Sequence, residues 1–154
     1  MINLYDEFRR IVVALEAADV PYAVCGGLAM AAYGYPRATQ DVDLLIAAER
    51  IEDAAASLEK LGYMTGTWLV LGKGRVRIYR MVKTDPGSPD YLVVDILAAI
   101  HEAEAAWRER QRIETGAGPV WFASRAGLIA MKRLRSSVQD LADIERLEGG
   151  GHGG

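Results

Sequence analysis

Cysteine, histidine and long apolar runs are scarce in this sequence of 154 residues, which contains one cysteine and two histidines. The single cysteine, Cys25, excludes an intrachain disulfide and a cysteine-rich zinc site, and it is typical of a reducing compartment. No uninterrupted apolar run approaches membrane-spanning length, and the N-terminus lacks the basic and apolar regions of a secretory signal. We therefore expect a cytoplasmic protein with no membrane association.

Excess positive charge is also missing. The 18 basic and 21 acidic residues leave a formal net charge of -3, so no global basic field is available for unaided binding to a phosphate backbone. The length, with 51% hydrophobic and 25% charged residues, predicts one ordinary globular domain. We assign this domain to residues 1–148. We expect the glycine-rich residues 149–154 to be a disordered tail, because they have too few side chains to pack.

Apolar periodicity divides the chain into helices and strands. Helical spacing predicts helices over residues 4–15, 28–33, 47–61 and 98–110, and one long helix over residues 124–147 with Ser124 as its N-cap. Strand patterns cover residues 22–25, 42–46, 68–71, 76–82 and 91–97, with residues 119–122 as an edge strand or connector. This order predicts an α+β domain whose mixed sheet is covered by helices.

Asp41 and Asp43 are two residues apart in Gln-Asp-Val-Asp-Leu-Leu-Ile. On a strand their carboxylates project from the same face, while Val42 and Leu44 enter the core. Two like charges at one place are stable when a divalent cation such as Mg²⁺ shares them, together with phosphate oxygens of a substrate. The alternative is a solvated Asp-x-Asp pair at the start of a strand, and the dipeptide pattern alone favours that alternative.

Asp95 lies inside Leu-Val-Val-Asp-Ile-Leu, which otherwise has the hydrophobicity of a central strand. An unpaired carboxylate there would cost several kcal/mol. We therefore expect Asp95 to be protonated, hydrogen-bonded or bound to metal. A third metal ligand and a structural ion pair explain this residue equally well.

Gly26 and Gly27 follow a short strand and precede a predicted helix. Because they have no side chains, their N–H groups can approach phosphate oxygens closely, and a helix N-terminus favours an anion. A tight strand-to-helix turn is the other interpretation. It is the commoner meaning of an isolated Gly-Gly pair.

The spacing of these elements resembles a family signature. Val-Cys-Gly-Gly, ending at Gly27, is followed by thirteen residues and then by Asp-Val-Asp-Leu, beginning at Asp41. This pattern is similar to the signature of the DNA polymerase β-like nucleotidyltransferase superfamily. The fuller strings Gly-Gly-Leu-Ala-Met and Arg-Ala-Thr-Gln-Asp-Val-Asp, with Leu-Ile-Ala-Met-Lys near the C-terminus, resemble stand-alone bacterial nucleotidyltransferases grouped with AbiEii-type toxins. The second glycine stands where serine is often found, which removes one hydroxyl contact to phosphate.

The resemblance implies a nucleotidyltransferase fold, which is α+β with a mixed sheet flanked by helices and a C-terminal helix packed on the domain. It implies an enzyme that uses a nucleoside triphosphate and Mg²⁺ or Mn²⁺ to transfer a nucleoside monophosphate to a hydroxyl acceptor. In this sequence the catalytic and metal-binding residues would be Asp41, Asp43 and Asp95. The nucleotide-binding residues would be Gly26, Gly27, Arg37, Thr39 and Lys132.

The sequence also predicts roles for residues before the Asp41–Asp43 pair and near the C-terminus. We expect Thr39 to orient the loop before Asp41, and Arg37 to pair with a phosphate or with Asp41 itself. In one continuous last helix, about 16 Å of helical rise separates Lys132 from Asp143, which predicts no shared contact.

Asp140 and Asp143 have a structural interpretation of their own. We expect these two carboxylates to cap the chain or to form salt bridges with arginines on a solvated face, rather than to bind metal.

Three acceptor classes fit the sequence: tRNA, a protein side chain and a small hydroxylated molecule such as an antibiotic. The toxin resemblance favours tRNA or protein and adds an antitoxin as a candidate partner. The chain is also short for an aminoglycoside-type enzyme with a full acceptor domain. Alternatives in other classes are a non-catalytic member that binds a nucleotide or a partner, and a metal-dependent phosphohydrolase. The phosphohydrolase would normally use histidine ligands, and neither histidine lies near the motif.

Overall fold

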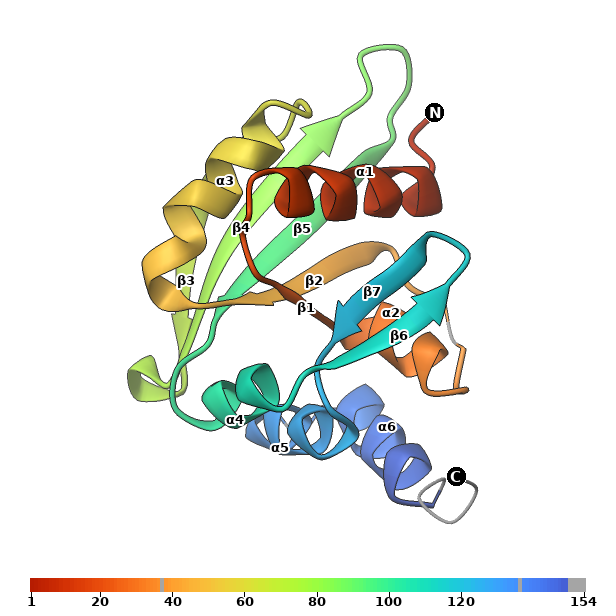
Figure 1. Cartoon of the computed structure of the whole chain (residues 1–154), viewed down its shortest axis with the longest axis vertical. Helices are drawn as coiled ribbons and strands as arrows, with labels where there is room; N and C mark the ends of the chain where they lie inside the picture. The colour runs from red at the N-terminus through yellow and green to blue at the C-terminus, as the bar shows by residue number, and fades with distance from the viewer. Residues whose placement is uncertain (37, 136, 150–154) are drawn as a thin grey trace.

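The computed structural model describes residues 1–36, 38–135 and 137–149 (Figure 1). Its helices are α1 (Leu4–Ala17), α2 (Gly26–Ala32), η1 (Ala48–Arg50), α3 (Ile51–Glu59), η2 (Gly72–Gly74), α4 (Glu102–Arg108), α5 (Arg125–Arg135) and α6 (Val138–Gly149). Its strands are β1 (Ala23–Cys25), β2 (Asp41–Ile46), β3 (Met64–Leu71), β4 (Val76–Thr84), β5 (Tyr91–Ala98), β6 (Gln111–Thr115) and β7 (Gly118–Phe122).

A single mixed sheet in the order β3-β4-β5-β2-β1-β7-β6 organises these elements. Strand β2 is parallel to β5, and β1 is parallel to β7, whereas the other neighbouring strands are antiparallel. Helices lie on the sheet and at one end of it (Figure 1). The α+β class and the helix-flanked mixed sheet expected from the sequence are therefore confirmed.

Helices α1 and α3 cover one face of the sheet and form most of the core with it (Figure 1). Helix α1 begins at the N-cap Asn3, whose side chain accepts a hydrogen bond from the Asp6 backbone N–H, and it buries Ile11 completely. Strand β2 turns Val42 and Leu44 into the same core. Because side chains alternate along a strand, Asp41 and Asp43 project from the opposite face.

Helix α5 packs against both α4 and α6 near the C-terminal end of the chain (Figure 1). Ser124 is the N-cap of α5, as expected, because its hydroxyl oxygen accepts a hydrogen bond from the Gly127 N–H at 3.0 Å. Gly127 lies against Ala106 of α4. A β-carbon built on Gly127 would be 2.4 Å from Cβ of Ala106, so only glycine fits there.

The long helix predicted over residues 124–147 is wrong, because the chain forms the two helices α5 and α6. Ser137 starts the second helix. Its hydroxyl accepts a hydrogen bond from the Asp140 N–H, and the Asp140 carboxylate accepts one in return from the Ser137 N–H. This reciprocal pair satisfies N–H groups that a new helix N-terminus leaves open, so it favours a restart of the helix over its continuation.

Several other boundaries differ from the sequence prediction. Helix α4 covers only Glu102–Arg108, because β5 extends to Ala98. The sequence analysis missed β6, and β7 is not an edge strand, since β6 continues the sheet beyond it. Gln-Arg-Ile-Glu-Thr, the sequence of β6, has a single apolar residue and therefore gives little strand signal.

Residues 149–154 were predicted to form a disordered tail. Gly149 is the last residue of α6, and the other residues of the expected tail, 150–154, lie outside the described part of the chain. Among the described residues, no helix combines the length and apolar character needed to cross a bilayer.

Substitution of Gly127 tests the packing of α4 on α5. We expect Gly127→Ala to lower the free energy of unfolding by about 1–3 kcal/mol, because the new methyl group overlaps Ala106. Urea unfolding measures the change. The control is Gly116→Ala, whose β-carbon meets nothing within 4 Å and which we expect to stay within about 0.5 kcal/mol of the wild type. Equal stability of the two variants would contradict the close packing.

Candidate active site

The sheet register brings three carboxylates to one place. Strand β2 carries Asp41 and Asp43, and the parallel pairing of β2 with β5 sets Asp43 opposite Asp95. Opposite residues of paired strands project from the same face of a sheet. The structure therefore brings the predicted catalytic residues Asp41, Asp43 and Asp95 together from strands that are about fifty residues apart in sequence.

The start of α2 closes directly on this cluster. Helix α2 begins at Gly26, two residues earlier than predicted, and Gly26 has a φ of +68°. A β-carbon on Gly26 would be 2.0 Å from Oδ2 of Asp43. Glycine is required here both by the left-handed backbone and by the contact with the carboxylate. The neighbouring Cys25 is buried, and burial raises the pKa of its thiol well above the usual range, which identifies it as a packing residue and not a nucleophile.

Burial and mutual repulsion make the carboxylates hard to ionise. The pKa of Asp43 is raised to about 7, first by burial and then by the negative charges of Asp95 and Asp41, against the opposing charges of Arg135 and Lys132. The pKa of Asp41 is also raised, first by burial and then by Asp95. A divalent cation would relieve both effects. Clustered carboxylate oxygens are the ligands that Mg²⁺ and Mn²⁺ prefer, so these residues fit such an ion.

Arg80 of β4 neutralises the third carboxylate. Its Nε and Nη2 donate to the two oxygens of Asp95 at 2.8 and 2.9 Å, in a bidentate ion pair. The antiparallel register of β4 and β5 sets Arg80 directly opposite Asp95. Of the states expected for Asp95, the structure shows the ion-paired one. Arg80 was not predicted as a site residue, because cross-strand register is not visible in a single sequence.

The ion pair between Arg80 and Asp95 limits metal binding in the observed conformation. Within residues 1–36, 38–135 and 137–149, no three side chains of the histidine, cysteine, aspartate or glutamate type are arranged to hold one metal ion. Asp41 and Asp43 are available to a cation, whereas both oxygens of Asp95 are engaged by Arg80. Metal binding by Asp95 stays a prediction that requires Arg80 to release it.

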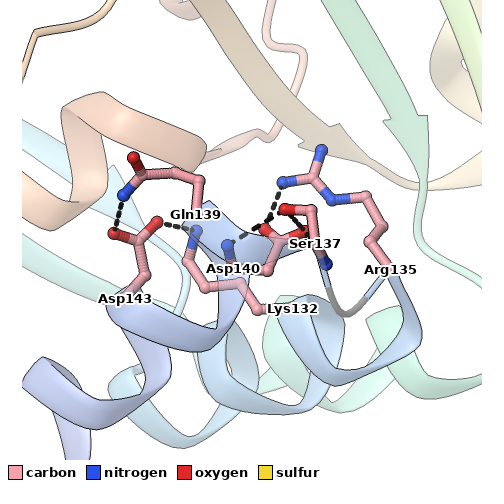
Figure 2. Close-up of polar contacts among 6 residues, drawn as sticks. All are labelled: Lys132, Arg135, Ser137, Gln139, Asp140 and Asp143. Carbon is pink, nitrogen blue, oxygen red and sulfur yellow. Dashed lines mark hydrogen bonds and ion pairs between the residues drawn. The ribbon is translucent and has the colours of Figure 1, made fainter.

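Lys132 lies in a buried polar network between α5 and α6 (Figure 2). Its Nζ donates to Oδ2 of Asp143 at 2.9 Å, and Nε2 of Gln139 donates to Oδ1 of the same carboxylate at 2.8 Å. The expectation that Lys132 and Asp143 share no contact is wrong. The expectation assumed one continuous helix, whereas α5 and α6 are two helices that pack against each other.

The same helix pair holds a second ion pair, between Arg135 and Asp140 (Figure 2). Nη2 of Arg135 donates to Oδ1 of Asp140 at 2.7 Å. Oδ2 of Asp140 also accepts hydrogen bonds from the backbone N–H and the hydroxyl of Ser137. Capping and ion pairing were expected of Asp140 and Asp143. Their expected solvated face is wrong, because both side chains are buried between the helices.

A pocket joins these helices to the carboxylates. Gly26, Asp43 and Asp95 line it on the sheet side, and Lys132 and Arg135 line it on the α5 side. Its other walls are mostly apolar and include Ile78, Leu97, Leu128 and Met131. The pocket thus has two of the carboxylates, Asp43 and Asp95, on one side, and on the other side two cations that are each ion-paired to α6.

The approach to β2 is described in part. The hydroxyl of Thr39 donates a hydrogen bond to the backbone oxygen of Asp41 at 3.3 Å, so Thr39 lies where it can orient the start of the strand. Arg37, the other residue predicted in this loop, lies outside the described residues.

Several solved structures have the same fold as this chain. The solved structure of ANT(2")-Ia in complex with adenylyl-2"-tobramycin superposes with a TM-score of 0.65 and 16% identity, over 92% of this chain and 86% of that chain. The lincomycin-bound lincosamide antibiotic adenylyltransferase LnuA gives 0.60 and 13%, over 96% and 97%. JHP933 from Helicobacter pylori gives 0.58 and 18%, over 93% and 63%. The fold is therefore the nucleotidyltransferase fold.

The family is shown by the sequence itself. Residues 2–119 match the model of a family described as uncharacterised nucleotidyltransferase, and the chain belongs to that family. It is thus a nucleotidyltransferase. No curated protein matches the chain in sequence.

The raised pKa of Asp43 predicts a pH-dependent stability in the absence of metal. The folded state keeps a proton up to a pKa of about 7, whereas an unperturbed aspartate loses it near 3.8, so stability falls as the pH rises between these values. We expect Asp43→Asn to be more stable than the wild type by about 2 kcal/mol at about pH 8, and the difference to vanish near pH 4.

Urea unfolding in EDTA at both pH values measures this difference. As a control, Mg²⁺ at the higher pH should stabilise the wild type and leave Asp43→Asn unchanged. A stability difference that is the same at both pH values would show that Asp43 ionises normally.

Proposed function

We propose that this chain transfers a nucleoside monophosphate from a nucleoside triphosphate to a hydroxyl acceptor, with Mg²⁺ or Mn²⁺ held by Asp41 and Asp43. The observation that carries the proposal is the register of β2 and β5, which gathers Asp41, Asp43 and Asp95 beside Gly26 in a chain of the nucleotidyltransferase family. We assign residues 1–148 to one catalytic domain, because the sheet takes strands from Ala23 through Phe122.

The carboxylates have separate roles in this proposal. A bound divalent ion supplies neutralisation of phosphate charge and activation of the acceptor hydroxyl. Asp43 is the central ligand, because it directly faces both Gly26 and Asp95. Asp95 completes the site after Arg80 releases it, and it accepts the proton of the incoming hydroxyl.

The triphosphate is bound by residues on both sides of the pocket. Gly26 and Gly27 allow the backbone to approach phosphate oxygens, because neither presents a side chain. Lys132 lies across the pocket on α5, where Asp143 holds its amine in one orientation. Thr39 keeps the start of β2 in place, and we retain Arg37 as a phosphate ligand from the resemblance alone.

For the acceptor, we propose a macromolecule, either tRNA or a protein side chain, as in a toxin of the AbiEii type with a cognate antitoxin. A small hydroxylated molecule is the second candidate, and one observation favours it. The chain covers 97% of LnuA, whose structure was solved with lincomycin bound. A short chain therefore no longer argues against an antibiotic acceptor.

Transfer itself is tested with nucleoside triphosphates radiolabelled on the α-phosphate, Mg²⁺, and a mixture of total tRNA and cell extract. We expect the wild type to label one acceptor class and Asp43→Asn to lower the rate by about a hundredfold or more, because a metal ligand is lost. Asp53→Asn, an exposed aspartate on α3, is the matched control and should keep the wild-type rate.

The position of the label identifies the acceptor as RNA, protein or small molecule. Nucleotide binding without transfer would favour the non-catalytic alternative. Release of labelled nucleotide with no labelled acceptor would favour a phosphohydrolase.

Arg80→Gln tests whether Asp95 joins the metal site. We expect the variant to bind Mn²⁺ about tenfold more tightly in the absence of nucleotide, because the ion no longer competes with the guanidinium. In EDTA it should lose about 1–2 kcal/mol of stability, since Asp95 loses its partner. Titration calorimetry and urea unfolding give the two quantities.

Arg50→Gln is the matched control for this variant. It breaks the exposed ion pair with Asp53, which we expect to change stability by less than about 0.5 kcal/mol and Mn²⁺ binding not at all. If Arg80→Gln leaves Mn²⁺ affinity unchanged, Asp95 is not a metal ligand.

A further inference from the structure

The two edges of the sheet differ in length and charge. Strand β6 at one edge has five residues, and two of them, Arg112 and Glu114, are charged. Strand β3 at the other edge has eight residues, Met-Thr-Gly-Thr-Trp-Leu-Val-Leu, with no charge and no proline. Charged residues and proline on an edge strand discourage pairing with another chain. Edge β6 has such protection, and edge β3 has none.

Strand β3 also presents large apolar side chains to solvent. The exposed fractions are 53% for Met64, 43% for Trp68, 56% for Val70 and 47% for Leu71. In the described part of the chain, no strand pairs with the outer edge of β3. Its outward backbone N–H and C=O groups therefore lack strand partners. Another β-strand is the element that would both form hydrogen bonds with these groups and cover the apolar side chains.

The regular part of β3 is compatible with its own copy. A β-bulge interrupts the pairing of β3 with β4 between Met64 and Thr67, which leaves residues 67–71 as the regular segment. An antiparallel copy related by a two-fold axis through Leu69 sets Trp68 opposite Val70 of the second copy. Aromatic and β-branched residues in such cross-strand positions stabilise a sheet.

The electrostatics of this edge also favour a second copy. The chain has a net charge of -3, which ordinarily keeps copies apart, but β3 itself is uncharged. At the start of β3, the hydroxyl of Thr65 lies 3.5 Å from the Glu59 carboxylate, whereas the end of β3 leads to Lys73. Antiparallel pairing brings the Glu59 end of one copy beside the Lys73 end of the other, so the charges that flank the strand are complementary.

Neighbouring side chains hold Trp68 ready for such a contact. The Arg77 guanidinium stacks on the Trp68 ring at 4.9 Å, and the rings of Trp68 and Tyr79 are 5.2 Å apart. Because Trp68 is already ordered in the single chain, less side-chain entropy is lost on association.

We propose that two copies of this chain form a homodimer through antiparallel pairing of β3 over residues 67–71, which continues the sheet from one copy into the other. Strands β4 and β5 separate this edge from β2. Asp41 and Asp43 therefore lie three strands from the interface and Asp95 lies two strands from it, and the proposal is independent of the proposed function.

Sedimentation equilibrium from micromolar to several hundred micromolar protein tests the proposal. We expect the wild type to approach twice the 16.8 kDa mass of the chain. Val70→Lys should weaken the dimer by about tenfold or more, because the two-fold axis introduces the charge twice against an apolar partner. Val13→Lys is the matched control: Val13 is 61% exposed on α1, and the substitution should leave the dissociation constant unchanged.

Amide hydrogen exchange of the wild type gives a second measurement that needs no variant. Exchange at residues 67–71 should slow as the protein concentration rises, while exchange in β6 stays constant. A wild type that is monomeric over the whole range overturns the proposal. So does a dimer that both lysine variants weaken equally, or one whose concentration-dependent protection lies outside β3.

Discussion

Electrostatic repulsion among Asp41, Asp43 and Asp95 is the constraint around which the site is built. Strands β2 and β5 must lie at the centre of the sheet to bury their apolar faces, and their parallel register then fixes Asp43 opposite Asp95. Burial strengthens the repulsion, because less water screens it. Compensation comes from elsewhere in the fold: Arg80 approaches from β4, and the cations of α5 lie across the pocket. Despite these cations the pKa of Asp43 stays raised to about 7, as expected of a carboxylate cluster that would fit a divalent ion.

The α5–α6 hairpin shows how the fold positions its cations. A buried lysine is costly unless it is paired, and Lys132 is paired with Asp143, which Gln139 also holds. Removal of one partner from such a pair leaves an uncompensated charge, so the network specifies the orientation of α6 as well as that of Lys132. The capping exchange between Ser137 and Asp140 starts α6 where it can supply these partners.

The fold does not by itself select the acceptor. Proteins with the same architecture, such as ANT(2")-Ia and LnuA, have been solved with adenylyl-2"-tobramycin or lincomycin bound, at 16% and 13% identity to this chain. At such identity the shared feature is the scaffold, and acceptor choice depends on the side chains around the pocket. Strand β4 separates the proposed dimer edge β3 from Asp95 on β5, and both β4 and β5 separate it from Asp41 and Asp43 on β2, so each copy would keep its own site.

Sequence alone determined the features that depend on local spacing. The alternation in Asp-Val-Asp placed Asp41 and Asp43 on one face of a strand. The periodicity of residues 4–15 predicted α1, and Ser124 was identified as an N-cap. Each of these features depends only on residues that are neighbours in the sequence. The Gly-Gly and Asp-x-Asp spacing also indicated the family. Tertiary structure decided what depends on register and on helix breaks. Arg80 meets Asp95 only through the pairing of β4 with β5, and Lys132 meets Asp143 only because α5 and α6 are separate helices that pack on each other. Both contacts join residues that no local pattern relates, so only the folded chain could reveal them.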